Sequence, residues 1–65
     1  MKANLLKAEI ARAGMTQTKL AEEIGMSPQT LSKKIITGKI GLDEAEKIIR
    51  VLRIKDPVAI FLRSN

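Results

Sequence analysis

Glycine and proline divide this chain into segments of about ten residues, and this division limits its fold more than any other feature of the sequence. Within the segments, apolar residues recur three or four positions apart, which is the period of an amphipathic helix. Glycine commonly ends a helix, and proline is tolerated at the first helical position. The sequence therefore predicts a series of short helices, divided at Gly14, Gly25, Gly38 and Gly41 and with starts marked by Pro28 and Pro57.

Capping residues and apolar spacing place the individual helices. Thr16, Ser27 and Asp56 each precede a segment, and their side chains can accept a hydrogen bond from a free N–H group of the first turn. Arg50 and Arg53 would complement the helix dipole near the end of the fourth helix. We expect helices at residues 3–13, 17–24, 28–38, 42–52 and 57–62. The expected inward residues are Leu6, Ile10, Leu20, Ala21, Ile24, Leu31, Ile35, Leu42, Ala45, Ile49 and Leu52.

The composition favours an all-α fold in one small domain. Sixty-five residues suffice for a single hydrophobic core, so we expect one domain over residues 1–65. The apolar residues are almost all aliphatic, with one Phe and no Trp or Tyr. Sheets favour β-branched and aromatic residues together, which makes a sheet the weaker interpretation. The expected architecture is a compact bundle of about five short helices.

The charge of the chain indicates a polyanionic partner. Twelve Lys and Arg against seven Asp and Glu give a formal net charge of +5 at pH 7. Such an excess on a small body attracts polyanions, most commonly nucleic acid, although it also serves solubility. Lys33, Lys34 and Lys39 lie between the acidic stretches 22–23 and 43–46. A basic cluster bounded by acidic residues favours a docking surface over a uniform solubilising charge.

Other function classes are disfavoured by the residues that the chain lacks. Without His or Cys, the usual nucleophile–base pairs and metal sites cannot be assembled. We therefore expect no enzyme activity, cofactor, metal or small-molecule ligand. The uncharged runs are far shorter than the ~20 residues that span a bilayer, and Lys7 and Glu9 interrupt any signal-peptide core. These features predict a cytoplasmic protein without a membrane partner.

Four residues in fixed register indicate a helix-turn-helix formed by the second and third helices. Two short helices that cross at a steep angle need a small residue at the crossing, and Ala21 supplies it. The turn needs a residue that tolerates positive φ four positions later, which is Gly25. Met26 then fills the turn, and Leu31 faces back toward Ala21. Four matches in register are more specific than an isolated glycine or a basic patch.

The segment TQTKLAEEIGMSPQTLSKKI, residues 16–35, resembles the Cro/repressor (lambda-repressor-like) family of helix-turn-helix DNA-binding proteins, in particular its phage Cro-like members. The resemblance covers nearly the whole chain. It implies a five-helix fold and a homodimer, or weakly dimerising monomer, that represses transcription from a pseudo-palindromic operator in double-stranded DNA, in a bacterial cytoplasm or nucleoid. The sequence departs from the family where Gly38 lies seven positions after Leu31 rather than six, and where Lys34 replaces a common apolar residue. We therefore expect Ile35 to take the buried position.

The third helix carries the candidates for base reading. A recognition helix enters the major groove and reads base edges with its N-terminal residues. Gln29 is the strongest candidate, because an amide can pair bidentately with adenine N6 and N7. Lys33 can donate to guanine or to phosphate, and Ser32 can bond to either a base or the backbone. Pro28 offers only apolar contact, and Ser27 has a competing role as a cap. The alternative for all five is an ordinary solvated helix surface.

A second group of residues is expected to contact phosphates. Gln17 resembles the family's phosphate-binding glutamine and stands at a helix start, where free N–H groups favour anions. Thr18 and Lys19 lie next to it, and Lys34 and Lys39 flank the other end of the recognition helix. Such contacts position a protein without specifying sequence and make binding salt-dependent.

The C-terminal residues contain more apolar surface than a short terminal helix can bury. Part of this group, which includes Ile60, must cover Leu5 and Leu6. The remainder is either a dimer patch, with Phe61 as its anchor, or a purely intramolecular cap on the core. The residues of the expected patch are Val58, Phe61 and Leu62.

Ile36 directly follows Ile35, so both side chains cannot enter the same core. We expect Ile36 to pack beneath the fourth helix. The alternative is that it contacts the DNA groove.

The main alternative function is a helix-turn-helix scaffold that binds protein, as in an antitoxin or antirepressor. Such proteins usually carry an extra partner-binding segment, whereas this chain ends at Asn65. A further alternative is an excised or engineered DNA-binding half of a larger repressor. The initial Met and the compact end favour the expectation of a complete protein.

Overall fold

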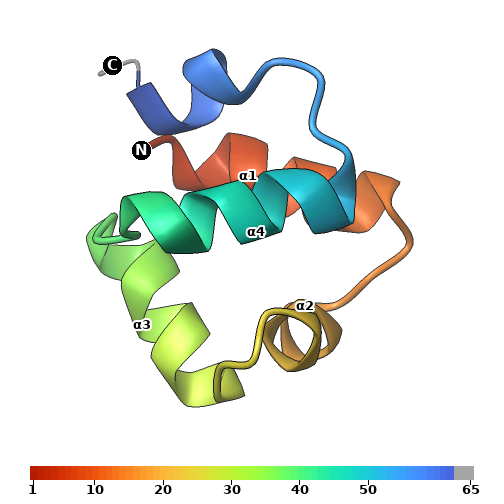
Figure 1. Cartoon of the computed structure of the whole chain (residues 1–65), viewed down its shortest axis with the longest axis vertical. Coiled ribbons are helices and arrows are strands. Elements are labelled where there is room, and N and C mark those ends of the chain that lie inside the picture. Colours follow the sequence, from red (N-terminus) through yellow and green to blue (C-terminus); the bar gives the residue numbers. More distant parts are fainter. Residues whose placement is uncertain (63–65) are drawn as a thin grey trace.

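Helices make up all the regular structure of residues 1–62, which are the residues that the computed structural model describes (Figure 1). They are α1 (Ala3–Arg12), α2 (Gln17–Glu23), α3 (Pro28–Thr37), α4 (Leu42–Leu52) and a short π-helical turn, η1 (Val58–Leu62). The predicted all-α bundle of five short helices is confirmed. That the domain extends through residue 65 stays a prediction, because residues 63–65 lie outside the described part.

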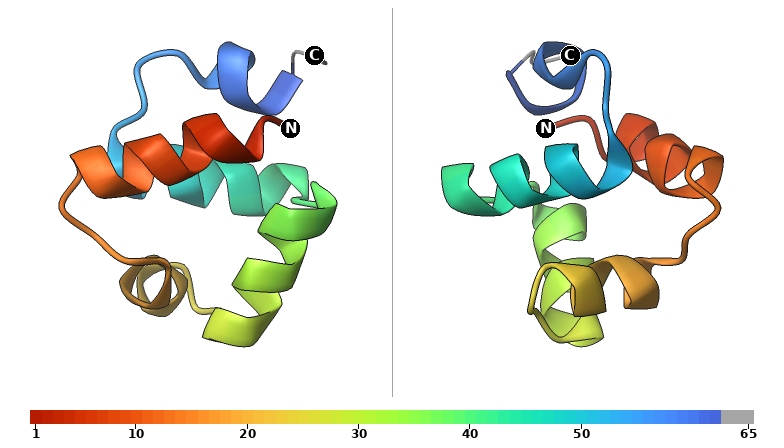
Figure 2. Two further views of the ribbon diagram at one scale, coloured as in Figure 1. Left: turned by 180° about the vertical axis from the view of Figure 1, so that it is seen from behind. Right: turned by 45° about the vertical axis from the view of Figure 1, so that its right-hand side comes forward.

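α4 crosses the middle of the molecule. α2 and α3 lie on one side of α4, and η1 lies on the other side near the start of α1 (Figures 1 and 2). α1 packs against η1, whereas α2 packs against both α3 and α4. The helix pair α2–α3 therefore forms one end of the molecule and is supported from behind by α4.

A small aliphatic core joins the helices. Its most deeply buried large side chains come from all four α-helices, and each contributes about 1.5–3 kcal/mol by leaving water. Within residues 1–62 no polar or charged side chain is buried. The relative positions of the helices therefore depend on apolar packing and on contacts at the helix ends. The most buried large residues are Leu6, Leu20, Leu31, Ile35, Ile48 and Leu52.

The helix ends carry the caps that the sequence predicts. The hydroxyls of Thr16 and Ser27 each accept a hydrogen bond from the backbone N–H three residues later, at 3.1 and 3.2 Å. The carboxylate of Asp56 does the same at 3.3 Å. Gly14 and Gly38 follow α1 and α3 with φ of 71°. α1, α2 and α3 each end one residue earlier than predicted.

The inward face of α4 differs from the predicted one. Leu42 and Ile49 were expected to join Ala45 and Leu52 in the core. Ile48 is fully buried instead, Ile49 is only half-buried, and Leu42 is 77% exposed. The reason is the phase of the helix: Ile48 lies three residues after Ala45 and four before Leu52, so these three share one stripe. Leu42, in the first turn, lies beyond the edge of the core.

The prediction that Ile36 packs beneath α4 is wrong. Ile36 is 77% exposed. Leu31 and Ile35 form the inward stripe of α3, as predicted, and one further residue turns the helix by about 100° away from that stripe.

η1 covers part of α1. Ile60 is 3% exposed, and its carbonyl accepts a hydrogen bond from the backbone N–H of Lys2 at 2.8 Å. Leu6 is fully buried, as expected, but Leu5 remains 41% exposed. The cover over α1 is therefore partial, and part of the C-terminal apolar surface remains uncovered.

Arg12 joins the ends of α1 and α4. Its guanidinium donates a hydrogen bond to the carbonyl oxygen of Leu52 at 2.7 Å and pairs with Glu9 at 2.7 Å. The last carbonyl groups of a helix lack partners within the helix. The contact from Arg12 satisfies one of them and fixes α4 to α1 at the end farthest from α3.

Arg53 caps α4 in a conformation that usually belongs to glycine. It directly follows the last residue of the helix, near the end where the sequence placed it, and has φ of 54°. This left-handed turn lets the N–H of Ile54 donate to the carbonyl oxygen of Ile49 at 3.1 Å. A residue with a Cβ pays about 1–2 kcal/mol for the left-handed conformation, whereas glycine does not.

We predict that Arg53→Gly raises the free energy of unfolding by about 0.5–1 kcal/mol, since relief of the backbone strain exceeds the added freedom of glycine in the unfolded chain. Urea unfolding measures the change. Arg50→Gly is the matched control, because it lies within α4 and should lower stability by about 1 kcal/mol. A loss of stability in both variants contradicts the strain at Arg53.

Candidate nucleic-acid interface

The turn between α2 and α3 has the geometry of a helix-turn-helix. Gly25 adopts φ of 73°, and the N–H of Met26 donates to the carbonyl oxygen of Ala21 at 2.8 Å. Apart from Gly25 and its two chain neighbours, no residue has a heavy atom within 4 Å of the place where a Cβ on Gly25 would stand, so the backbone conformation, not lack of space, requires glycine. Ala21 and Leu31 are both fully buried, and Met26 packs against the core. The predicted register is confirmed at all four residues.

One face of α3 is exposed and carries a row of three side chains. Gln29, Lys33 and Ile36 are four and three residues apart, on the side opposite the buried Leu31 and Ile35. Within residues 1–62, the side chains of Gln29 and Lys33 make no hydrogen bond or ion pair. An amide and an ammonium one helical turn apart are therefore available to a partner.

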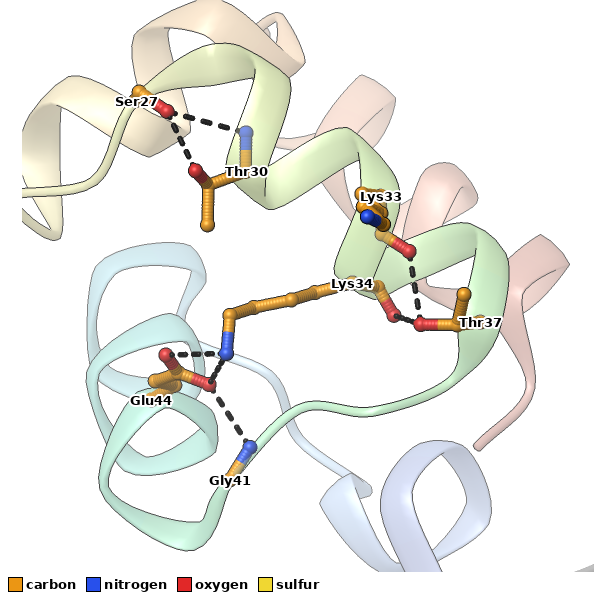
Figure 3. A network of polar contacts seen from close by, with 7 residues as sticks. All are labelled: Ser27, Thr30, Lys33, Lys34, Thr37, Gly41 and Glu44. Atoms are coloured by element: carbon orange, nitrogen blue, oxygen red, sulfur yellow. Dashed lines mark hydrogen bonds and ion pairs between the residues drawn. The ribbon is translucent and has the colours of Figure 1, made fainter.

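The other predicted base-reading residues lie at the edges of this face. Pro28 begins α3 and Ser32 lies one turn later, and both are half-buried. The Ser27 hydroxyl accepts a hydrogen bond from the Thr30 N–H at 3.2 Å and donates one to Thr30 Oγ1 at 2.7 Å (Figure 3). Ser27 is therefore occupied as a cap, which was its expected competing role.

Thr30 is an exposed residue of this region that sequence reasoning missed. Its hydroxyl accepts a hydrogen bond from Ser27 and donates none within residues 1–62, so its proton is available to a partner. The signal was present in the sequence, because a threonine three residues after a capping serine lies within reach of the serine hydroxyl.

Lys34 reaches from α3 to the first turn of α4 (Figure 3). Its ammonium lies 3.2 and 3.1 Å from the two carboxylate oxygens of Glu44. Glu44 Oε1 also accepts a hydrogen bond from the N–H of Gly41 at 2.9 Å, which caps α4 although Gly41 has no side chain to complete a capping box. The Gly41 N–H and the Lys34 ammonium lower the pKa of Glu44. A phosphate contact by Lys34 therefore requires exchange of this ion pair.

The predicted phosphate-binding residues of α2 lie at its exposed start. Gln17 is the first residue of the helix and is half-buried, and Thr18 is exposed. The ammonium of Lys19 lies 3.8 Å from the carboxylate of Glu22 and 3.4 Å from that of Glu23. Exposed ion pairs of this kind contribute at most about 1 kcal/mol, so a phosphate can displace them.

Lys39 lies between α3 and α4, just beyond the left-handed Gly38, and is exposed. Its backbone N–H donates to the carbonyl oxygen of Lys34 at 3.0 Å, which fixes the connection at the end of α3. Lys39 and Lys33 thus have exposed charges without an ion pair among residues 1–62, whereas the Lys34 ammonium is paired with Glu44 of α4.

The predicted dimer residues border an apolar groove between α4 and η1. The groove has a volume of about 170 Å³. Leu62 is 74% exposed, Val58 is exposed and Phe61 is half-buried. Leu42, which was expected in the core, also lines the groove. The lining residues are Leu42, Ala45, Glu46, Ile49, Pro57, Val58, Phe61 and Leu62.

Comparison with known proteins assigns the family. The family model described as helix-turn-helix matches residues 6–58. The chain belongs to this helix-turn-helix family. The family consists of DNA-binding regulatory domains and is not enzymatic. Neither a curated protein nor a solved structure matches the chain in two further comparisons.

Across the described residues, no cluster of acidic side chains is suited to hold a metal ion. No helix in that part of the chain has the length and apolar character needed to cross a membrane.

We predict that Glu44→Gln lowers the free energy of unfolding by about 0.5–1 kcal/mol at pH 7, because it removes the charge that pairs with Lys34. The pKa of Glu44 is lowered in the folded chain, so its contribution is present above the unfolded pKa and is lost as pH falls through the folded one. The two proteins should therefore converge in stability at acid pH.

Glu46→Gln is the control for this prediction, because Glu46 is exposed on the same helix and has no ion pair within residues 1–62. Thermal unfolding from pH 3 to pH 7 measures both variants. If Glu44→Gln lowers the free energy of unfolding by the same amount at every pH, the role of the ion pair is contradicted.

Proposed function

We propose that this protein is a sequence-specific transcriptional regulator, acting as a Cro-like repressor, that reads double-stranded operator DNA with α3 in the major groove. The observation that carries the proposal is the exposed face of α3, where Gln29 and Lys33 lie one turn apart with no partner among residues 1–62. Side chains committed within the fold cannot read bases, whereas these two are available. The family and the net charge of +5 support the same function.

The proposed contacts divide into base reading and phosphate binding. Gln29 pairs with adenine, and Lys33 donates to guanine or to a phosphate. Ser32, Pro28 and Ser27 border these contacts. Phosphate binding is assigned to Gln17, Thr18 and Lys19 at the start of α2 and to Lys39 after α3, with Lys34 contributing only where its pair with Glu44 is exchanged.

We also propose that two copies bind the operator together through the apolar groove between α4 and η1. An exposed groove lined almost entirely by apolar side chains is the kind of surface that proteins bury against a partner. Leu42 and Leu62 both line it and are 77% and 74% exposed, which suits an isologous contact in which each copy covers the groove of the other. A two-fold pair of reading helices matches an inverted repeat in DNA.

Selection of bound sequences from a random duplex pool at near-physiological salt tests this function. Enrichment of an inverted repeat with half-sites about one helical turn apart supports the dimeric repressor. Enrichment of a single half-site supports the DNA-binding function and contradicts the proposed dimer. No enrichment contradicts the proposal and favours the protein-binding alternative of the antitoxin or antirepressor type.

We predict that Gln29→Ala weakens binding to the selected operator by about 1–3 kcal/mol, because a bidentate contact to a base is lost. Fluorescence anisotropy with labelled operator and random duplexes measures the change. The loss should be confined to the operator, since a base contact contributes little on random DNA. Equal losses on both duplexes contradict the assignment of Gln29 to base reading.

Lys39→Ala is the matched comparison from the same end of the interface. It should weaken binding to all DNA similarly and reduce the slope of log Kobs against log salt concentration by about one unit. A sequence-dependent effect of Lys39→Ala would place it among the base-reading residues instead.

We predict that Leu62→Asp reduces binding to the inverted repeat to the level of a single half-site, because it places a charge in the groove. The fold should be retained, since Leu62 is 74% exposed. Analytical ultracentrifugation of the protein–DNA complex gives the stoichiometry, and Leu5→Asp, outside the groove, is the control. Two bound copies of Leu62→Asp with undiminished affinity rule out this interface.

A further inference from the structure

We propose that Ile36 is a specificity-determining residue that recognises the 5-methyl group of a thymine in the operator. This inference rests on the proposed function of α3. It concerns a residue that belongs neither to the core nor to the groove between α4 and η1. Ile36 is 77% exposed, is not among the apolar residues packed against the core, and does not line the groove.

The position of Ile36 places it in the reading row. It lies seven residues after Gln29 and three after Lys33, on the face opposite Leu31 and Ile35. At a rise of about 1.5 Å per residue, Gln29 and Ile36 are about 10 Å apart along α3. That length corresponds to about three base pairs of DNA at roughly 3.4 Å each. The row can therefore contact neighbouring base pairs of one half-site.

The end of α3 is fixed well enough for Ile36 to discriminate between bases. The hydroxyl of Thr37 donates to the carbonyl oxygen of Lys33 at 2.9 Å (Figure 3). Gly38 ends the helix with a left-handed cap. The pair between Lys34 and Glu44 joins the same turn to α4. These contacts on both sides of Ile36 oppose fraying, which is common at helix ends.

The chemistry of Ile36 selects thymine among the bases. In the major groove only thymine presents a methyl group, at C5, and apolar side chains recognise it by contact. A β-branched side chain has few accessible rotamers and loses little freedom when it is covered. Contact with a methyl group also removes exposed aliphatic surface of Ile36 from water. The row thus reads adenine with an amide at one end and thymine with an aliphatic side chain at the other.

Replacement of single thymines by deoxyuridine tests this inference, because deoxyuridine lacks only the 5-methyl group. Each thymine of the selected operator is replaced in turn, and binding of the wild type, Ile36→Ala and Leu5→Ala is measured by anisotropy. Leu5→Ala removes the same number of carbon atoms from an exposed leucine of α1. Ile36→Ala should fold normally, since Ile36 is exposed and Ala is the best helix former.

For the wild type and Leu5→Ala, we expect one thymine per half-site whose replacement by deoxyuridine weakens binding roughly fourfold. This factor corresponds to the free energy of burying one methyl group. It should lie about three base pairs from the adenine assigned to Gln29. Ile36→Ala should bind the thymine operator roughly fourfold more weakly and no longer distinguish thymine from deoxyuridine there.

Two results would overturn the inference while leaving the proposed function intact. One is a wild type that is insensitive to deoxyuridine at every thymine. The other is an Ile36→Ala variant that keeps the full thymine preference, which would assign the methyl contact to another side chain such as Pro28. If the random pool yields no operator, the proposed function itself fails, and the inference fails with it.

Discussion

The close crossing of α2 and α3 is the contact on which the rest of the structure depends. α2 has only seven residues, too few for a helix to persist alone in water, so its position comes from packing. Ala21 permits the close approach, Gly25 reverses the chain, and Leu31 returns to the same buried point. Larger side chains at Ala21 would separate the helices and move the exposed face of α3 relative to the start of α2.

The lysines of the candidate interface differ in whether their charge is already paired with a carboxylate. Lys34 is neutralised by Glu44, and Lys19 lies near two carboxylates of its own helix. Lys33 and Lys39 therefore carry much of the available positive charge next to α3. Under the proposed function, few phosphate contacts on each copy would limit non-specific binding. Discrimination among sequences would then depend more on the row of side chains along α3.

Local signals in the sequence were sufficient to predict much of the fold. Caps at Thr16, Ser27 and Asp56 and the left-handed Gly25 depend on residues a few positions apart, so they could be predicted from the sequence alone. The register of the helix-turn-helix could be predicted for the same reason.

Features that depend on helix phase or on distant contacts could not be predicted in this way. α4 has apolar residues at both 48 and 49, and only packing against the other helices decides which of them is buried. The exposure of Ile36 has the same origin. The partner of Lys34 lies ten residues away on another helix, and its choice depends on how α3 and α4 meet. The bases that Gln29 and Lys33 contact depend on the DNA as well as on the protein, so those roles stay predictions.

The first turn of α4 has a mechanical consequence for an operator-bound pair. Glu44 in this turn pairs with Lys34 near the end of α3, and Leu42 in the same turn lines the apolar groove. In a pair joined through the groove, one rigid turn thus connects each reading helix to the symmetry axis. In the proposed pair, the first turn of α4 would act as a spacer of fixed length, so changes there would alter the separation of the two half-sites rather than the bases preferred within each.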